Sequence, residues 1–197
     1  MTKDQPSSER RRLMQGGGLL LSGAAVALLA GCQTEAGAAQ VSDQDTSQDA
    51  DLLNAALALE YEGVFAYQAG AGTGLLTSQG VKLAELFLGH HERHRDLLIR
   101  TVERIGGQPV APESDSVYAD RLQLDLIASG ADVLDLAFGL EQAAANAYIQ
   151  VLPRFSDPLF GQFAARIAAD EVMHWTTLAV ILDKPLPEAA LTFGAVT

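Results

Sequence analysis

Three of the four histidines in this 197-residue chain fall within five positions, at His90, His91 and His94. The fourth, His174, lies three positions after Glu171. Imidazole and carboxylate side chains are common ligands of transition metals, and they also serve as acid–base groups or as parts of an exposed polar surface. The residues that the fold places opposite these histidines decide between the three roles.

An internal repeat links these residues to the rest of the chain. LEYEGVFAYQ, from Leu59, resembles LEQAAANAYIQ, from Leu140, and each has a Glu seven positions before a Tyr. FLGHHERH, from Phe87, aligns with IAADEVMH, from Ile167. A repeat of this kind indicates two structurally equivalent halves. The aligned pairs are Glu60 with Glu141, Tyr67 with Tyr148, His91 with Glu171, and His94 with His174.

The elements that carry these residues are predicted to be helices. Apolar residues at steps of three and four predict helices over about residues 49–69, 78–105, 131–152 and 157–182. Gly106 and Pro153 end the second and third, and Asp157 caps the fourth. About 25 residues separate the second from the third, with a short helix expected between them. We predict an all-α four-helix bundle over residues 49–182, with a long crossover between its second and third helices.

In every predicted helix, ionisable residues replace apolar ones near the middle of the buried face. Buried without partners, such groups would each destabilise the fold by several kcal/mol. They must therefore pair with one another or bind metal, and oxygen and nitrogen ligands together suit iron, manganese or zinc. We favour the metal site. Its predicted ligands are Glu60, His91, His94, Glu141, Glu171 and His174.

One Glu from each of two helices, with Glu-x-x-His from each of the others, resembles the ferritin-like di-iron carboxylate arrangement. The bundle also resembles exported bacterial ferritin-like proteins, which are similar to plant desiccation-related proteins. The resemblance implies a transition metal, most simply iron, with manganese, zinc or copper as alternatives. It implies an oxidoreductase or oxidative-stress role; a non-catalytic stress or structural protein and a metal-sequestering protein remain alternatives, and a homodimer remains open.

The chain departs from this pattern at His91, which stands where the motif has glutamate. Three carboxylates then remain instead of four, which favours reduced iron, zinc or copper, or a single bound ion. His90 is expected at the rim of the site. Tyr67 and Tyr148 are expected beside the ligands, one or two helical turns from the glutamates.

Residues 1–31 are predicted to be an export signal. Arg10, Arg11 and Arg12 precede an apolar run that is too short for a permanent membrane-spanning helix. The arginines resemble a twin-arginine signal, and the sequence ending in Cys32 resembles a lipobox, which implies lipidation of Cys32. We expect an exported protein, periplasmic or at the cell surface, anchored to a membrane by this lipid; an uncleaved anchor helix is the alternative.

Residues 32–48 are small and polar and are predicted to be a flexible tether. Residues 183–197 are predicted to be an extended tail that packs on the bundle through Leu191 and Phe193. Without residues 1–31, the chain has 9 basic and 23 acidic residues, a formal charge of −14. This charge argues against a nucleic-acid partner. The single cysteine excludes an intrachain disulfide.

Overall fold

The computed structural model describes residues 43–194, which contain helices and no strands. This confirms the predicted all-α class. Three short helices join the long ones: α4 (Asp115–Arg121), η1 (Leu124–Leu126) and η2 (Leu152–Arg154). The four long helices are α2 (Asp43–Gly72), α3 (Ser78–Arg104), α5 (Gly130–Val151) and α6 (Pro158–Ile181).

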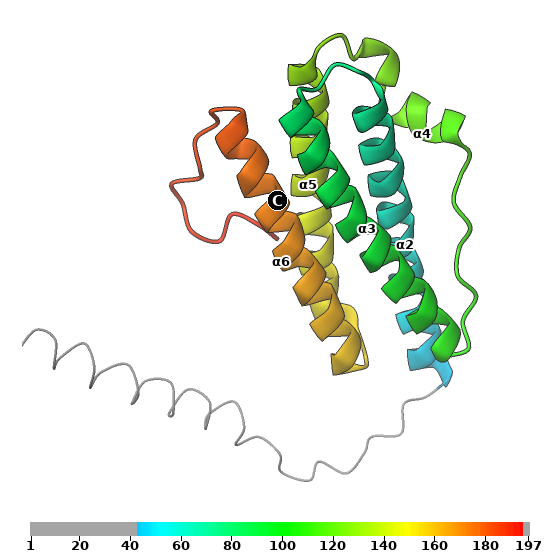
Figure 1. The fold of residues 1–197 in the computed structure, drawn as a ribbon. Coiled ribbons are helices and arrows are strands. Elements are labelled where there is room, and N and C mark those ends of the chain that lie inside the picture. Colours follow the sequence, from blue (N-terminus) through cyan, green and yellow to red (C-terminus); the bar gives the residue numbers. More distant parts are fainter. Residues whose placement is uncertain (1–42, 195–197) are drawn as a thin grey trace, which may run out of the picture. The chain divides into compact units, whose positions relative to one another are not determined.

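The long helices form the predicted bundle (Figure 1). α2 packs antiparallel to α3, and α5 packs antiparallel to α6. The crossover between α3 and α5 carries α4, which lies beside α2, and η1. Within residues 43–194, none of the helices has both the length and the apolar composition needed to cross a bilayer.

Side-chain caps fix the starts of three long helices. The Thr77 hydroxyl accepts a hydrogen bond from the Gly80 amide at 3.1 Å at the start of α3. Ser129 and Asp132 form a reciprocal capping box at the start of α5. Asp157 caps α6, whose first residue is the proline that follows it. The starts of these three helices agree with the predicted bounds to within about one residue.

α2 begins at Asp43, so the last six residues of the predicted tether are helical. A contact between residues far apart in the sequence holds this extension in place. The Asp49 carboxylate is buried and accepts hydrogen bonds from the backbone amides of Ser156 and Asp157, at 2.8 and 3.0 Å. The first turns of α2 are therefore fixed against the start of α6, which the polar composition of the segment does not reveal.

The predicted export signal with Arg10, Arg11 and Arg12, the lipidation site Cys32, and tether residues 32–42 lie outside the described residues. The described part of the tail, 183–194, has neither helix nor strand. Phe193 packs edge-on against Trp175, with ring centroids 5.1 Å apart, whereas Leu191 is 92% exposed. Leu191 therefore does not anchor the tail, contrary to expectation.

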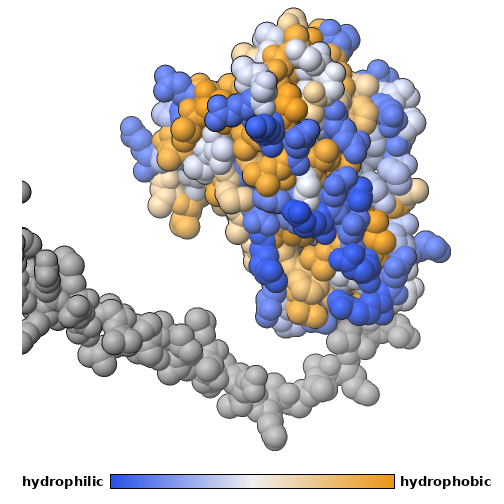
Figure 2. Space-filling view, viewed as in Figure 1, coloured by the Kyte–Doolittle hydropathy of each residue, from blue (hydrophilic) through white to orange (hydrophobic). Residues whose placement is uncertain are grey.

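The hydrophobic core consists of two clusters at different levels of the bundle. The larger cluster includes Leu53, Leu57 and Leu98, and the smaller one includes Phe87 and Leu178. The predicted ligands occupy intermediate positions on all four helices. Hydrophilic residues cover much of the visible outer surface, with hydrophobic patches between them (Figure 2).

Candidate metal centre

Six ionisable side chains from four helices meet inside the bundle. α2 and α5 each contribute one glutamate, α3 contributes two histidines, and α6 contributes a glutamate and a histidine. None of the six residues is more than 7% exposed. The structure thus brings together the whole predicted ligand set: Glu60, His91, His94, Glu141, Glu171 and His174.

These side chains form two groups of four with potential ligand atoms lying within 4.8 Å of one another. His91 and Glu171 belong to both groups. Each group offers two carboxylate oxygens and two imidazole nitrogens, a donor set and number that suit a four-coordinate transition-metal ion. Group 1 is Glu60, His91, His94 and Glu171; group 2 is His91, Glu141, Glu171 and His174.

The two shared residues present different atoms to the two groups. His91 Nδ1 lies 2.9 Å from Glu60 Oε2, and His91 Nε2 lies 3.3 Å from Glu141 Oε1. Glu171 Oε1 lies 3.3 Å from His94 Nδ1, and Glu171 Oε2 lies 3.2 Å from His174 Nδ1. Both shared side chains therefore span the two groups.

The metal-free centre is a network of ion pairs. Burial raises the pKa of Glu60, but the imidazoles of His91 and His94 outweigh burial and bring that pKa to about 2. Burial lowers the pKa of His94, but the carboxylates of Glu171 and Glu60 outweigh it and raise that pKa to about 10. Adjacent carboxylates likewise raise the pKa values of His91 and His174 against the effect of burial. The His94 imidazole is therefore protonated at neutral pH, and a metal ion bound there must displace its proton.

Two tyrosines hold the two single glutamates from opposite helices. Tyr67 on α2 donates a hydrogen bond to Glu141 on α5, and Tyr148 on α5 donates one to Glu60 on α2. Burial and these carboxylates raise the pKa values of both phenols well above the ordinary range. Both hydroxyls stay protonated and orient the carboxylates, and both tyrosines lie beside the ligands as the sequence indicated.

Two further side chains lie close to the Nε2 atoms of His174 and His94. His90 Nδ1 lies 2.9 Å from His174 Nε2, which places His90 at the rim as expected. His94 Nε2 lies 3.1 Å from the half-exposed carboxylate of Asp170. Asp170 was not among the residues predicted from the sequence. The repeat carried the signal, because Asp170 aligns with His90 when Glu171 aligns with His91.

Gly63 on α2 makes room for the His91 ring. A Cβ atom at Gly63 would lie 2.9 Å from His91 Nδ1 and 3.1 Å from Cε1. Any larger residue would therefore push the ring away from its present position. Gly63 is a second residue of the site that was not predicted from the sequence, because its role depends on how closely α2 and α3 approach each other.

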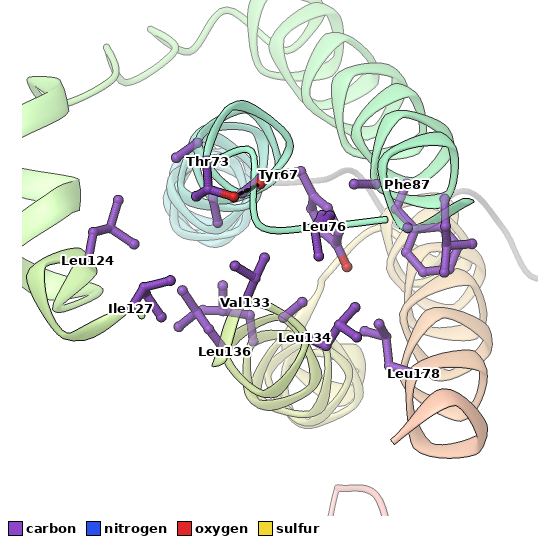
Figure 3. A pocket seen from close by; sticks show the side chains of 18 residues that line it. Tyr67, Thr73, Leu76, Phe87, Leu124, Ile127, Val133, Leu134, Leu136 and Leu178 are labelled. Carbon is purple, nitrogen blue, oxygen red and sulfur yellow. Dashed lines mark hydrogen bonds between the residues drawn. The ribbon is translucent and has the colours of Figure 1, made fainter. Parts of the chain in front are cut away.

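Two cavities border the centre. One, of about 60 Å³, has His91 and Glu141 in its wall. The other, of about 90 Å³, is almost wholly apolar; Phe87 on α3 and Leu178 on α6 lie on one side of it, and Tyr67 on α2 also lines it (Figure 3). The Phe87 ring stacks on His174, with centroids 4.0 Å apart, and separates this apolar cavity from the ligands.

Two buried atoms of group 1 support the fit of the donor set to a metal ion. His94 Nδ1 and Glu171 Oε1 lie 3.3 Å apart, within ion-pair distance, but neither atom makes a hydrogen bond. An ion bound between these two atoms would satisfy both, and carboxylate–imidazole sets are ordinary ligands of iron, manganese and zinc.

Comparisons with known proteins agree with this arrangement. The chain is similar in fold to a conserved hypothetical protein from Mycobacterium tuberculosis, with a TM-score of 0.63 and 22% sequence identity. That match covers 75% of this chain and 99% of the other. No curated protein matches the sequence. The model of the ferritin-like domain matches residues 48–184, and the chain therefore belongs to the ferritin-like domain family.

Proposed function

We propose that this is an exported, lipid-anchored ferritin-like protein that binds transition-metal ions, above all iron, in its buried Glu/His centre. The main support for metal binding is the pair of four-residue groups, each with two oxygen and two nitrogen donors. The support for export and lipid anchoring is the sequence from Arg10 to Cys32.

We further propose an oxidoreductase or oxidative-stress role. A redox-active ion at the centre would supply one-electron transfer. The protein's own residues position the ligands: Tyr67 and Tyr148 orient two carboxylates, and His90 and Asp170 lie close to the Nε2 atoms of two histidines. The cavity beside His91 has two of the ligands, His91 and Glu141, in its wall.

A purely structural role is the second candidate function. It is favoured by the ion pairs that the carboxylates and imidazoles already make with one another, such as His91 with Glu60 at 2.9 Å. In that case the six groups would stabilise the bundle without any metal. Titration of the metal-free full chain with Co²⁺, followed by visible absorption, separates the two functions.

For the metal-binding function we expect Co²⁺ absorption that saturates and that His174→Ala reduces by half or more, with helical circular dichroism retained. Glu85→Ala, an exposed change on α3, serves as the control and should bind like the wild type. Absence of Co²⁺ absorption in folded wild-type protein would favour the structural role. With Fe²⁺, an absorbance change on exposure to air supports oxidation, whereas bound iron without such a change supports sequestration.

A further inference from the structure

We infer that His91 binds two metal ions at once, one at each nitrogen of its ring. This inference rests on the proposed metal-binding function and specifies how the two ions are joined. In the arrangement that the chain resembles, a glutamate occupies the position of His91. The exchange therefore replaces one bridging ligand by another of different length.

The orientation of the ring is the first observation in support. His91 Nδ1 faces Glu60 of group 1, and His91 Nε2 faces Glu141 of group 2. Nε2 also lies 3.9 Å from Glu171 Oε2, which in turn lies 3.2 Å from His174 Nδ1. The two ring nitrogens thus point to different metal positions, as the two oxygens of Glu171 do on the opposite side.

The space around the ring is the second observation. Gly63 lies three residues after Glu60, and Ala144 lies three residues after Glu141 in the other half of the repeat. The half with the larger side chain, His91, thus has the smaller residue on the facing helix. Because a Cβ at Gly63 would lie 2.9 Å from Nδ1, the missing methyl group allows the ring to occupy the bridging position.

The bridge predicts a distance between the two ions. Metal–nitrogen bonds of about 2 Å on opposite sides of an imidazole place the ions about 6 Å apart. Two-metal sites in which the ions are close together have separations of about 3.5–4 Å. The separation thus distinguishes a bridging His91 from a pair of ions held by carboxylates.

Crystals of the full chain loaded with Co²⁺ give this separation directly from anomalous scattering. We expect two peaks about 6 Å apart with the His91 ring between them. Two peaks about 3.5–4 Å apart, or a single peak, would overturn the bridge while leaving the metal-binding function intact. Folded protein with no cobalt in crystal or solution would instead refute the metal-binding function itself.

Two substitutions test the inference in solution through the number of Co²⁺ ions bound. His91→Glu should keep two ions per chain, and in crystals it should shorten their separation to about 3.5–4 Å. Gly63→Ala should push the ring aside and lower the number bound from two to one. Gly139→Ala is the matched control, because it makes the same change in helix α5 with no atom within 4 Å of the new methyl group. Equal binding by both alanine variants would contradict the bridge.

Discussion

At the scale of single residues, the two tyrosines determine how the buried carboxylates are presented. Each hydroxyl donates to a glutamate on the other helix, so Tyr67 and Tyr148 join α2 to α5 through the centre. Their raised pKa values keep both phenols neutral. The tyrosines therefore act as fixed hydrogen-bond donors around physiological pH.

Tyr148→Phe should remove one of these donors without changing the packing of the ring. We expect the free energy of unfolding of the metal-free protein to fall by about 1–3 kcal/mol, because Glu60 loses a buried hydrogen bond. Urea denaturation measures the change. Tyr61→Phe, a half-buried tyrosine on the same helix as Glu60, should cost clearly less. Similar losses in the two variants would contradict the role assigned to Tyr148.

The six candidate ligands could be identified from the sequence because the internal repeat and helical periodicity place them on the buried face of each helix. Two other residues of the site could not be predicted in that way. Gly63 matters only because α2 and α3 bring its backbone to the His91 ring. Asp170 matters only because its carboxylate reaches His94 on another helix. Both roles depend on distances between helices, which periodicity within one helix does not contain.

At the scale of elements, Asp49 connects the start of α2 to the start of α6. Its two carboxylate oxygens accept from the amides of Ser156 and Asp157, just before α6 begins. Such amides have no partner within their own helix. The buried carboxylate satisfies them and also complements the positive end of the α6 dipole.

Asp49→Ala should therefore leave two amides unsatisfied and destabilise the bundle by about 1–3 kcal/mol. Hydrogen exchange should show faster exchange at the start of α6 than elsewhere in that helix. Asp51→Ala removes an exposed carboxylate two residues further along α2 and should have little effect. If the two variants exchange and unfold alike, the contact between α2 and α6 does not stabilise the fold.

The ends of the long helices show which boundaries local sequence determines. Gly106, Pro153 and Asp157 act through their own backbone and caps, and the predicted helix ends near them agree with the structure. The start of α2 was predicted six residues too late. Its polar residues resemble a linker in composition, and the stabilising partner lies more than 100 residues away.

At the scale of the whole molecule, the protonation of the centre is coupled to the stability of the bundle. His94 has an ordinary pKa of 6.5 and a pKa of about 10 in the folded protein. Between these values the folded state keeps a proton that the unfolded state releases, so stability falls as pH rises. Glu60 acts in the opposite sense, because its pKa drops from 4.5 to about 2 on folding.

The metal-free protein should therefore be most stable between about pH 4.5 and 6.5, with a decline toward pH 10 and another toward pH 2. Urea denaturation at a series of pH values, with a chelator present, measures this profile. A flat profile between pH 6.5 and 10 would contradict the protonated imidazole network. Added Co²⁺ should reduce the alkaline decline, since metal binding replaces the protons that are lost.

The metal content of the natively produced protein tests the central claim most directly. Elemental analysis of folded full chain, purified without chelators, should find transition metal approaching two ions per chain. His174→Ala should remove at least half of this metal while circular dichroism still shows the helical fold. Folded wild-type protein that carries no more than a trace of any transition metal, and that takes up none when it is supplied, would contradict the account.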